Sequence, residues 1–421
     1  MRFDFLLLAS TSDRLEPVPI PRLRFFAQTA LTLVLPLAVS GCRTHGFPDE
    51  PAGYREYAYV SNGGSNTVSV LDLVYLRTDR TLQVGSGPSA LAVNPVRNEV
   101  YAVNMQSGSV SVIDALANRV VATIPVHRLP HFIAVEPTGH VAYVVNSASN
   151  TVSVLDLDHR REIGVAGTGE QPWVDRISPD GRTLVVSNRA SGSISVFDVK
   201  PYESEGAAPG LPRLRAAFSG CSSAGDIAIL PDSSKAFVAC SGGDQVMAVS
   251  LAAAPASWAA KQNPSLMRDH LLCFLAVGKK PESLAMKPDG GEIFVSNFGS
   301  DSISEIATWT NEVGGTYTIG SRPLRGVVSQ DNGTLWVSNS GADSIGIYSI
   351  DDGKLAGSVH TGSVPGALAF SADDHLLLAA DTHSGDIALV RTQGSAGPAL
   401  FTLLPAGASP NAIVTKVVSS K

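Results

Sequence analysis

The sequence predicts an all-β protein folded as a β-propeller, a ring of small four-stranded sheets called blades. Short runs rich in Val, Ile, Tyr and Thr alternate with clusters of Gly, Pro, Asn and Asp, as expected for strands joined by turns. The pattern also repeats along almost the whole chain, and most repeats are 42 residues long. Four strands in a unit of that length are typical of propeller blades and not of helical solenoids.

The segment from Gly87 to Val126 shows one complete unit. Its expected strands cover residues 90–93, 100–104, 109–114 and 120–124. The turn between the first two strands is Asn94-Pro95, and the turns that follow contain Gly108 and Asn118. These residue types favour turns because they tolerate or impose the required backbone angles.

The second strand of each unit ends in a recurring residue, which allows the units to be counted. These eight residues are Asn62, Asn104, Asn146, Asn188, Cys240, Asn297, Asn339 and Asp381, spaced 42 residues apart except for two middle intervals of 52 and 57. The first unit lacks a first strand, and the segment 409–418 is a first strand with nothing after it. Pairing the two chain ends would complete one blade and remove the exposed edges. We therefore predict eight blades, with seven as the alternative.

Several units share a motif that resembles the YVTN-type β-propeller repeat family. The residues that carry the resemblance are AYVSNGGSNTVSVLDL (58–73), VYAVNMQSGSVSVID (100–114) and AYVVNSASNTVSVLDL (142–157), and weaker copies extend it over residues 57 to 418. The resemblance implies the propeller fold, with residues 57–421 as a single domain. It implies little about activity, because propellers host unrelated functions.

The N-terminal region has the arrangement of an export signal. Two arginines, Arg22 and Arg24, precede an apolar run from Phe25 to Val39 that is short for a membrane-spanning helix. The following Ser40-Gly41-Cys42 resembles a bacterial lipobox, which implies that Cys42 is lipidated. We expect residues 1–41 to be a signal peptide (1–21 being an overextended start) and 42–56 a flexible tether. A plain signal peptide is the alternative. The expected location is the cell envelope, on the outer membrane.

The middle units carry two insertions and three cysteines. The insertions, at 200–213 and 251–270, are rich in Pro, Gly and Ala and are expected to form loops between third and fourth strands. Cys221 precedes a first strand and Cys240 ends the paired second strand, so antiparallel pairing favours a disulfide between them. The chain-entropy model gives such a loop about 3 kcal/mol of stabilisation.

Function is expected on the face where the loops before the first strands gather around the central channel. The candidate binding residues there are His127, Arg128, His131, Trp173, Asp175, Arg176, Lys280, Glu282 and Arg325. Asp175 and Arg176 stand out because neighbouring units have apolar residues at these positions, and buried polar groups need partners. They are expected to pair with each other or with another blade, or else to face a ligand. The mostly cationic set favours a small anionic ligand or an acidic partner.

The remaining signals argue against several function classes. The net charge of −7 lacks the basic footprint of a nucleic-acid binder. No haem CxxCH motif, paired CxxC zinc motif or GxSxG nucleophile motif occurs, so we predict no metal, no cofactor and no catalytic residue. We expect a monomeric, lipid-anchored, non-catalytic module that binds an envelope protein or a small anion. The alternative is a propeller enzyme, similar to lactonases, lyases or quinone-dependent dehydrogenase subunits, with its site in the channel.

Overall fold

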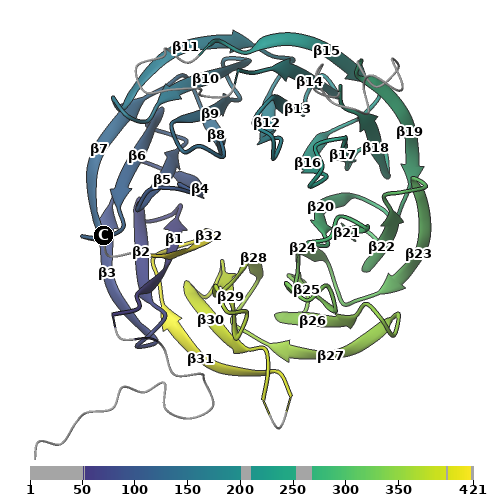
Figure 1. Ribbon diagram of the computed structural model, residues 1–421. Helices are drawn as coiled ribbons and strands as arrows, with labels where there is room; N and C mark the ends of the chain where they lie inside the picture. The colour runs from purple at the N-terminus through teal and green to yellow at the C-terminus, as the bar shows by residue number, and fades with distance from the viewer. Residues whose placement is uncertain (1–50, 52, 201–209, 253–267, 395–396, 419–421) are drawn as a thin grey trace, which may run out of the picture. The chain divides into compact units, whose positions relative to one another are not determined.

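The computed structural model describes residues 51, 53–200, 210–252, 268–394 and 397–418 (Figure 1). These residues form 32 strands in eight antiparallel sheets of four strands each, and no helix occurs among them. None of the described segments is therefore a helix that could cross a membrane.

In seven of the sheets the four strands are consecutive in the sequence, and each sheet runs from an inner to an outer strand. The first three are β4 (Pro88–Val93), β5 (Glu99–Asn104), β6 (Ser109–Asp114), β7 (Arg119–Pro125); β8 (Pro130–Val135), β9 (Val141–Asn146), β10 (Thr151–Asp156), β11 (Arg161–Gly167); and β12 (Pro172–Ile177), β13 (Thr183–Asn188), β14 (Ser193–Asp198), β15 (Arg213–Ser219). The next two are β16 (Ala224–Ile229), β17 (Lys235–Cys240), β18 (Gln245–Ser250), β19 (His270–Ala276); and β20 (Pro281–Met286), β21 (Glu292–Asn297), β22 (Ser302–Ala307), β23 (Glu312–Thr318). The last two are β24 (Pro323–Val328), β25 (Thr334–Asn339), β26 (Ser344–Ser349), β27 (Lys354–His360); and β28 (Pro365–Phe370), β29 (Leu376–Asp381), β30 (Asp386–Arg391), β31 (Ala399–Pro405).

The eighth sheet joins the two ends of the described chain. It contains β3 (Arg77–Gln83), β2 (Thr67–Asp72), β1 (Glu56–Asn62) and β32 (Pro410–Val417) in that order. β32 pairs antiparallel with β1, with Tyr59 opposite Val414. The prediction of eight blades closed by the terminal segments is confirmed, and Figure 1 shows the inner strands around the centre of the ring.

The core lies between neighbouring blades. In one representative layer, Val103 and Val112 of the β4–β7 blade pack with Val144 and Leu155 of the β8–β11 blade. All four side chains are fully or almost fully buried. Each blade therefore buries its two faces against its two neighbours, which explains why apolar residues run almost continuously through the middle strands.

The recurring Asn at the end of the second strand stabilises the next strand of its own blade. The Asn146 side-chain amide donates to Thr151 Oγ1 at 3.3 Å and to Ser153 Oγ at 2.8 Å. Asn62, Asn104, Asn188 and Asn297 make the equivalent pair of bonds to residues five and seven positions later. The repeated asparagines and serines are therefore part of the architecture.

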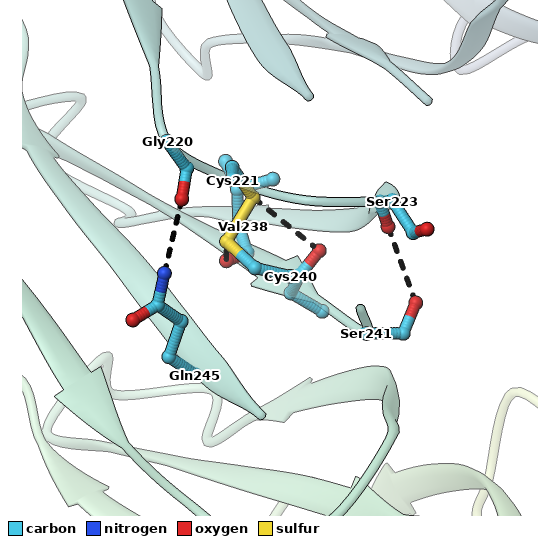
Figure 2. Close-up of a disulfide and its surroundings, with 8 residues drawn as sticks. Gly220, Cys221, Ser223, Val238, Cys240, Ser241 and Gln245 are labelled. Atoms are coloured by element: carbon cyan, nitrogen blue, oxygen red, sulfur yellow. Dashed lines mark hydrogen bonds between the residues drawn. A yellow bond between two sulfur atoms is a disulfide. The ribbon is translucent and has the colours of Figure 1, made fainter. Parts of the chain in front are cut away.

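The β16–β19 blade replaces this Asn with Cys240, which forms a disulfide with Cys221 (Figure 2). The Sγ–Sγ distance is 2.01 Å and both residues are fully buried. The adjoining loop is held by Gln245, whose amide donates to the carbonyl of Gly220, and by Ser241, whose hydroxyl donates to the carbonyl of Ser223. The disulfide thus ties the end of β17 to the segment before β16, whereas the asparagine of other blades bonds to the third strand.

The loops that enter the channel share one backbone feature. The residue directly before each inner strand has a positive φ, and these residues are Gly87, Leu129, Gln171, Ser223, Lys280, Arg322, Val364 and Ser409. A left-handed residue reverses the chain sharply. Because the reversal occurs at the same place in every blade, the first residues of all inner strands are set at a similar height around the channel.

Some expected features lie outside the described residues. They include residues 1–41, Cys42 and most of the 42–56 segment, together with residues 201–209 and 253–267 of the two insertions. The strands that flank the insertions are described, and they are the third and fourth strands of their blades.

Candidate channel-face binding site

The inner strands place their second and third residues near the channel-face loops. His131 and Trp173 are the second residues of β8 and β12, and Asp226 and Arg325 are the third residues of β16 and β24. Four separate blades therefore contribute polar or aromatic side chains at a similar level of the channel.

Asp226 connects two arginines from different blades. Arg176 Nη2 lies 3.4 Å from Asp226 Oδ1, and Arg325 Nη1 lies 3.2 Å from Asp226 Oδ2. The aspartate side chain is only 8% exposed, whereas the arginine side chains are 38% and 44% exposed. Backbone N–H groups of Ile227 and Leu284 also donate to the carboxylate. The carboxylate is thus fixed in the wall, while both guanidinium groups remain open to solvent.

A stack of aromatic and cationic groups lies on the neighbouring blades. The rings of His131 and Trp173 are stacked with centroids 3.5 Å apart, and His131 Nδ1 donates to the Trp173 carbonyl at 2.8 Å. Arg189 Cζ lies 4.6 Å from the Trp173 ring centroid, and Arg176 Cζ lies 4.5 Å from the Phe132 ring centroid. These cation–π contacts hold the guanidinium groups without neutralising their charge.

The pKa of His131 depends on residues of both the Trp173 stack and the Asp226 network. This pKa is lowered to about 4, chiefly by burial and also by the positive charges of Arg189 and Arg325, while the hydrogen bond to the Trp173 carbonyl acts to raise it. Arg325, which pairs with Asp226, thus contributes to the pKa of His131 in the Trp173 stack. At neutral pH His131 is uncharged, so the site has three arginines against one aspartate and is positive.

A cavity of about 570 Å³ opens beside the stack. Its lining includes Gln171 and Arg189 from one blade and Gly220, Ser222 and Ser223 from the next. This volume lies within the range of about 300 to 1,000 Å³ that is usual for small-ligand sites.

Asp175 does not belong to the channel site, and the expectation that it pairs with Arg176 is wrong. Its side chain is fully buried at a strand position that is Ile133 in β8 and Ile227 in β16, both of which lie in hydrophobic clusters. Neither carboxyl oxygen has a hydrogen-bond partner. Burial raises the pKa of Asp175 to about 8, although the charge of Arg176 acts to lower it. Arg176 instead pairs with Asp226 of the next blade, so the interpretation of an inter-blade ion pair holds for it.

Four other candidate residues lie apart from the arginine network. His127 Nε2 lies 3.5 Å from Glu162 Oε1 on β11, the outer strand of its blade. Arg128 is exposed on the rim, where its backbone N–H donates to the Ser149 hydroxyl. Lys280 and Glu282 form a pair with each other at 3.6 Å.

Sequence reasoning missed two residues of the site, Arg189 and Asp226. Arg189 follows the recurring Asn188, at a position that is Gly63, Met105 or Ser147 in other units, so its charge is a departure from the repeat. Asp226 is a charged residue on an otherwise apolar inner strand, which is the same signal that drew attention to Asp175 and Arg176.

The arrangement is suited to binding an anion. Arginine presents several N–H donors in a planar fork that matches carboxylate and phosphate groups. Among the described residues, each of Arg176 and Arg325 uses one side-chain nitrogen for Asp226 and makes no other side-chain hydrogen bond. No group of three or more His, Cys, Asp or Glu side chains is placed to hold a metal ion in the described part of the chain.

Comparison with known proteins supports the same fold. A family described as lactonase, 7-bladed β-propeller, matches residues 129–207 and 326–403, which is less than half of the chain. The protein is a β-propeller. Its eight sheets exceed the number in that family's description by one. A comparison with curated proteins found no match.

Solved structures with the same fold include enzymes of different kinds. A dihydro-heme d1 dehydrogenase, NirN, aligns with a TM-score of 0.68 at 15% identity, covering 87% of this chain and 76% of the other. A candidate 6-phosphogluconolactonase from Bacteroides uniformis aligns with a TM-score of 0.58 at 17% identity, covering 86% of this chain and 99% of the other. At these identities the similarity concerns the fold alone.

Proposed function

We propose that this propeller is a non-catalytic binding module that takes a small anionic ligand at the mouth of its channel. The observation that carries the proposal is the pair of half-exposed arginines, Arg176 and Arg325, held on the single buried carboxylate of Asp226. A ligand with a carboxylate or phosphate group would accept hydrogen bonds from both guanidinium groups at once.

The geometry favours a binding role over a purely structural ion pair. Both guanidinium groups remain partly exposed, at 38% and 44%, so their remaining N–H donors are open to a ligand. Here Asp226 fixes the arginines in place before a ligand arrives, so less side-chain freedom is lost on binding. The nearby Arg189 adds a further positive charge that would attract an anion into the channel.

The proposal is tested by calorimetric titration with inorganic phosphate, malonate and citrate. We expect at least one of these anions to bind, and Arg176→Ala and Arg325→Ala each to weaken binding by about tenfold or more, because a charge-assisted contact is lost. Arg161→Ala is a matched control, since Arg161 pairs with Asp156 on the outer surface. Absence of binding, or equal loss in the control, would contradict the proposal.

Lactone hydrolysis is the second candidate function. It is supported by the lactonase family match, whose first segment includes His131 and Trp173, and by the fold similarity to a candidate 6-phosphogluconolactonase. His131 donates through Nδ1, so Nε2 of the neutral ring is left to accept a proton from water. Turnover of 6-phosphogluconolactone that His131→Ala abolishes would favour the enzyme over the binding module.

We further propose that the protein is exported and anchored in the cell envelope through a lipid on Cys42, and that it works there as a monomer. The supporting observation is the lipobox-like sequence that ends at this residue. Labelling cells with a radioactive fatty acid is expected to mark the wild-type protein and not Cys42→Ala. Crosslinking in intact cells, with the same variant as control, would then reveal any envelope protein that binds it.

A further inference from the structure

A tryptophan stands almost fully exposed on the rim opposite the channel-face loops. Trp309 lies in the turn between β22 and β23 and is 89% exposed. Turns between third and fourth strands leave each blade at the end opposite the loops that enter the inner strands. Trp309 is therefore separate from the anion site proposed above. An exposed indole of this kind often marks a contact surface.

The turn that carries Trp309 departs from the repeat. In the equivalent β6–β7 turn, Asp114 accepts backbone hydrogen bonds from Leu116 and Ala117, and other blades use Asp72 and Asp156 in the same way. The β22–β23 turn has Ala307 at this position and lacks that cap. Its backbone conformation must therefore be held by other contacts.

Those contacts come from β17 of the preceding blade and from the β20–β21 turn. Lys235 of the preceding blade donates through Nζ to the Thr308 carbonyl at 2.7 Å and to Asn311 Oδ1 at 3.1 Å. The Thr308 hydroxyl donates to the carbonyls of Gly290 and Gly291, at 2.6 and 3.0 Å. The residues on either side of Trp309 are thus fixed to the first residue of β17 and to the β20–β21 turn. The indole is exposed on a backbone that is already ordered.

Trp309 borders a cavity of about 430 Å³ between the β16–β19 and β20–β23 blades. Polar groups in its lining include Asp232, Ser234, Lys235 and Asp289. Asp232 raises the pKa of Lys235 through its charge, whereas burial lowers that pKa more strongly. Asp289 lies 3.5 Å from Lys287. Lys287 lies outside the lining and also pairs with Glu292 at 3.3 Å. The lining itself therefore holds two carboxylates and one ammonium group.

We propose that this cavity is a binding site for a neutral oligosaccharide, with one pyranose ring stacked on Trp309. The apolar C–H face of a sugar ring packs against the negative face of an indole. Its hydroxyl groups both donate and accept, so they fit a lining that offers carboxylate and hydroxyl oxygens together with an ammonium group. The two carboxylates would repel an anionic ligand, and the Lys235 ammonium group would repel a cationic one. A neutral polyol avoids both costs.

The test is a titration of the full chain with cellotetraose, chitotetraose, maltotetraose and mannotetraose at millimolar concentrations, followed by tryptophan fluorescence and calorimetry. We expect at least one tetrasaccharide to bind. Trp309→Ala is expected to lower its affinity at least tenfold, and Trp309→Phe to retain part of it. Leu116→Ala is the matched control, because Leu116 occupies the same turn position in another blade and is also exposed.

The outcomes separate this site from the channel. Binding that depends on Trp309 and is unchanged in Arg176→Ala supports the inference, whether or not the channel binds anions. Failure of all four sugars to bind, or binding that Trp309→Ala leaves unchanged, overturns it. The circular dichroism spectrum and melting temperature of each variant should match those of the wild type, since Trp309 has little buried surface to lose.

Discussion

Replacing Asp175 with leucine should stabilise the protein and remove a large part of its pH dependence. The same strand position is Leu91, Ile133 or Ile227 in other blades, so an aliphatic side chain has a place in this layer. Asp175 is instead a fully buried carboxyl group with no hydrogen-bond partner. Arg176 and Tyr143 are the groups whose electrostatic interactions with it are evident.

The magnitude follows from the pKa. Burial raises the pKa of Asp175 from 3.8 to about 8. The folded protein therefore holds a proton that the unfolded chain releases, which costs about 4 kcal/mol at pH 7. Because the pKa of Asp175 is higher in the folded state than in the unfolded chain, its contribution to the free energy of unfolding falls as the pH rises. Its contribution becomes less favourable as the pH rises from about 4 to about 8, by about 1.4 kcal/mol per pH unit, and is constant above that range.

The assay is urea unfolding at pH 4.5, 6, 7.5 and 9, with free energies compared between wild type and Asp175→Leu. We expect the variant to be more stable by about 4 kcal/mol near pH 7, and the difference to shrink towards pH 4. Asp175→Asn, which keeps the size but does not titrate, should show the same trend with pH. Ile133→Leu, a change at the equivalent position of β8, should give a small difference that is the same at every pH. A wild-type protein as stable as both Asp175 variants at pH 8 would refute the reasoning.

Four further changes are expected to alter the stability of the protein, each through one local feature of the structure. Reducing the Cys221–Cys240 disulfide, which closes a loop of 19 residues, should cost about 3 kcal/mol in unfolding experiments, and the reductant should not affect a double alanine variant. Asn146→Ala removes three side-chain hydrogen bonds and should cost about 2 kcal/mol, with phosphate binding unchanged; an unaltered stability would contradict the architectural role. Val364→Gly should stabilise by about 1 kcal/mol, because a β-branched residue has a φ of 59° there; a less stable variant would show that the valine side chain matters more. His131→Phe should abolish the part of the stability that wild type loses as the pH falls from about 6.5 to about 4, since the pKa of His131 is lowered to about 4; parallel pH profiles for the two proteins would count against that pKa.

The candidate site was only partly predictable. His131, Trp173, Arg176 and Arg325 were predicted to lie on the channel face, Arg176 also as a departure from the repeat, and the structure brings them to one region of the channel. Asp226 was missed, although it connects Arg176 to Arg325 from a position 99 residues before the second arginine. Such a contact depends on how the blades are placed relative to one another in the ring, and the sequence of a single repeat does not contain that information.

The sequence by itself determined the architecture of this protein. The 42-residue period, the turn residues and the offset of the two chain ends specify four-stranded blades and the closing strand pair, and they favour eight blades over seven. These features are local or repeated, so each copy reinforces the same interpretation. Only the tertiary structure decided which side chains share an environment. Asp175 and Arg176 are adjacent in the chain, yet one is buried between blades and the other reaches into the channel. The physical reason is that successive residues of a strand point to opposite faces, and each face of an inner strand meets a different neighbour.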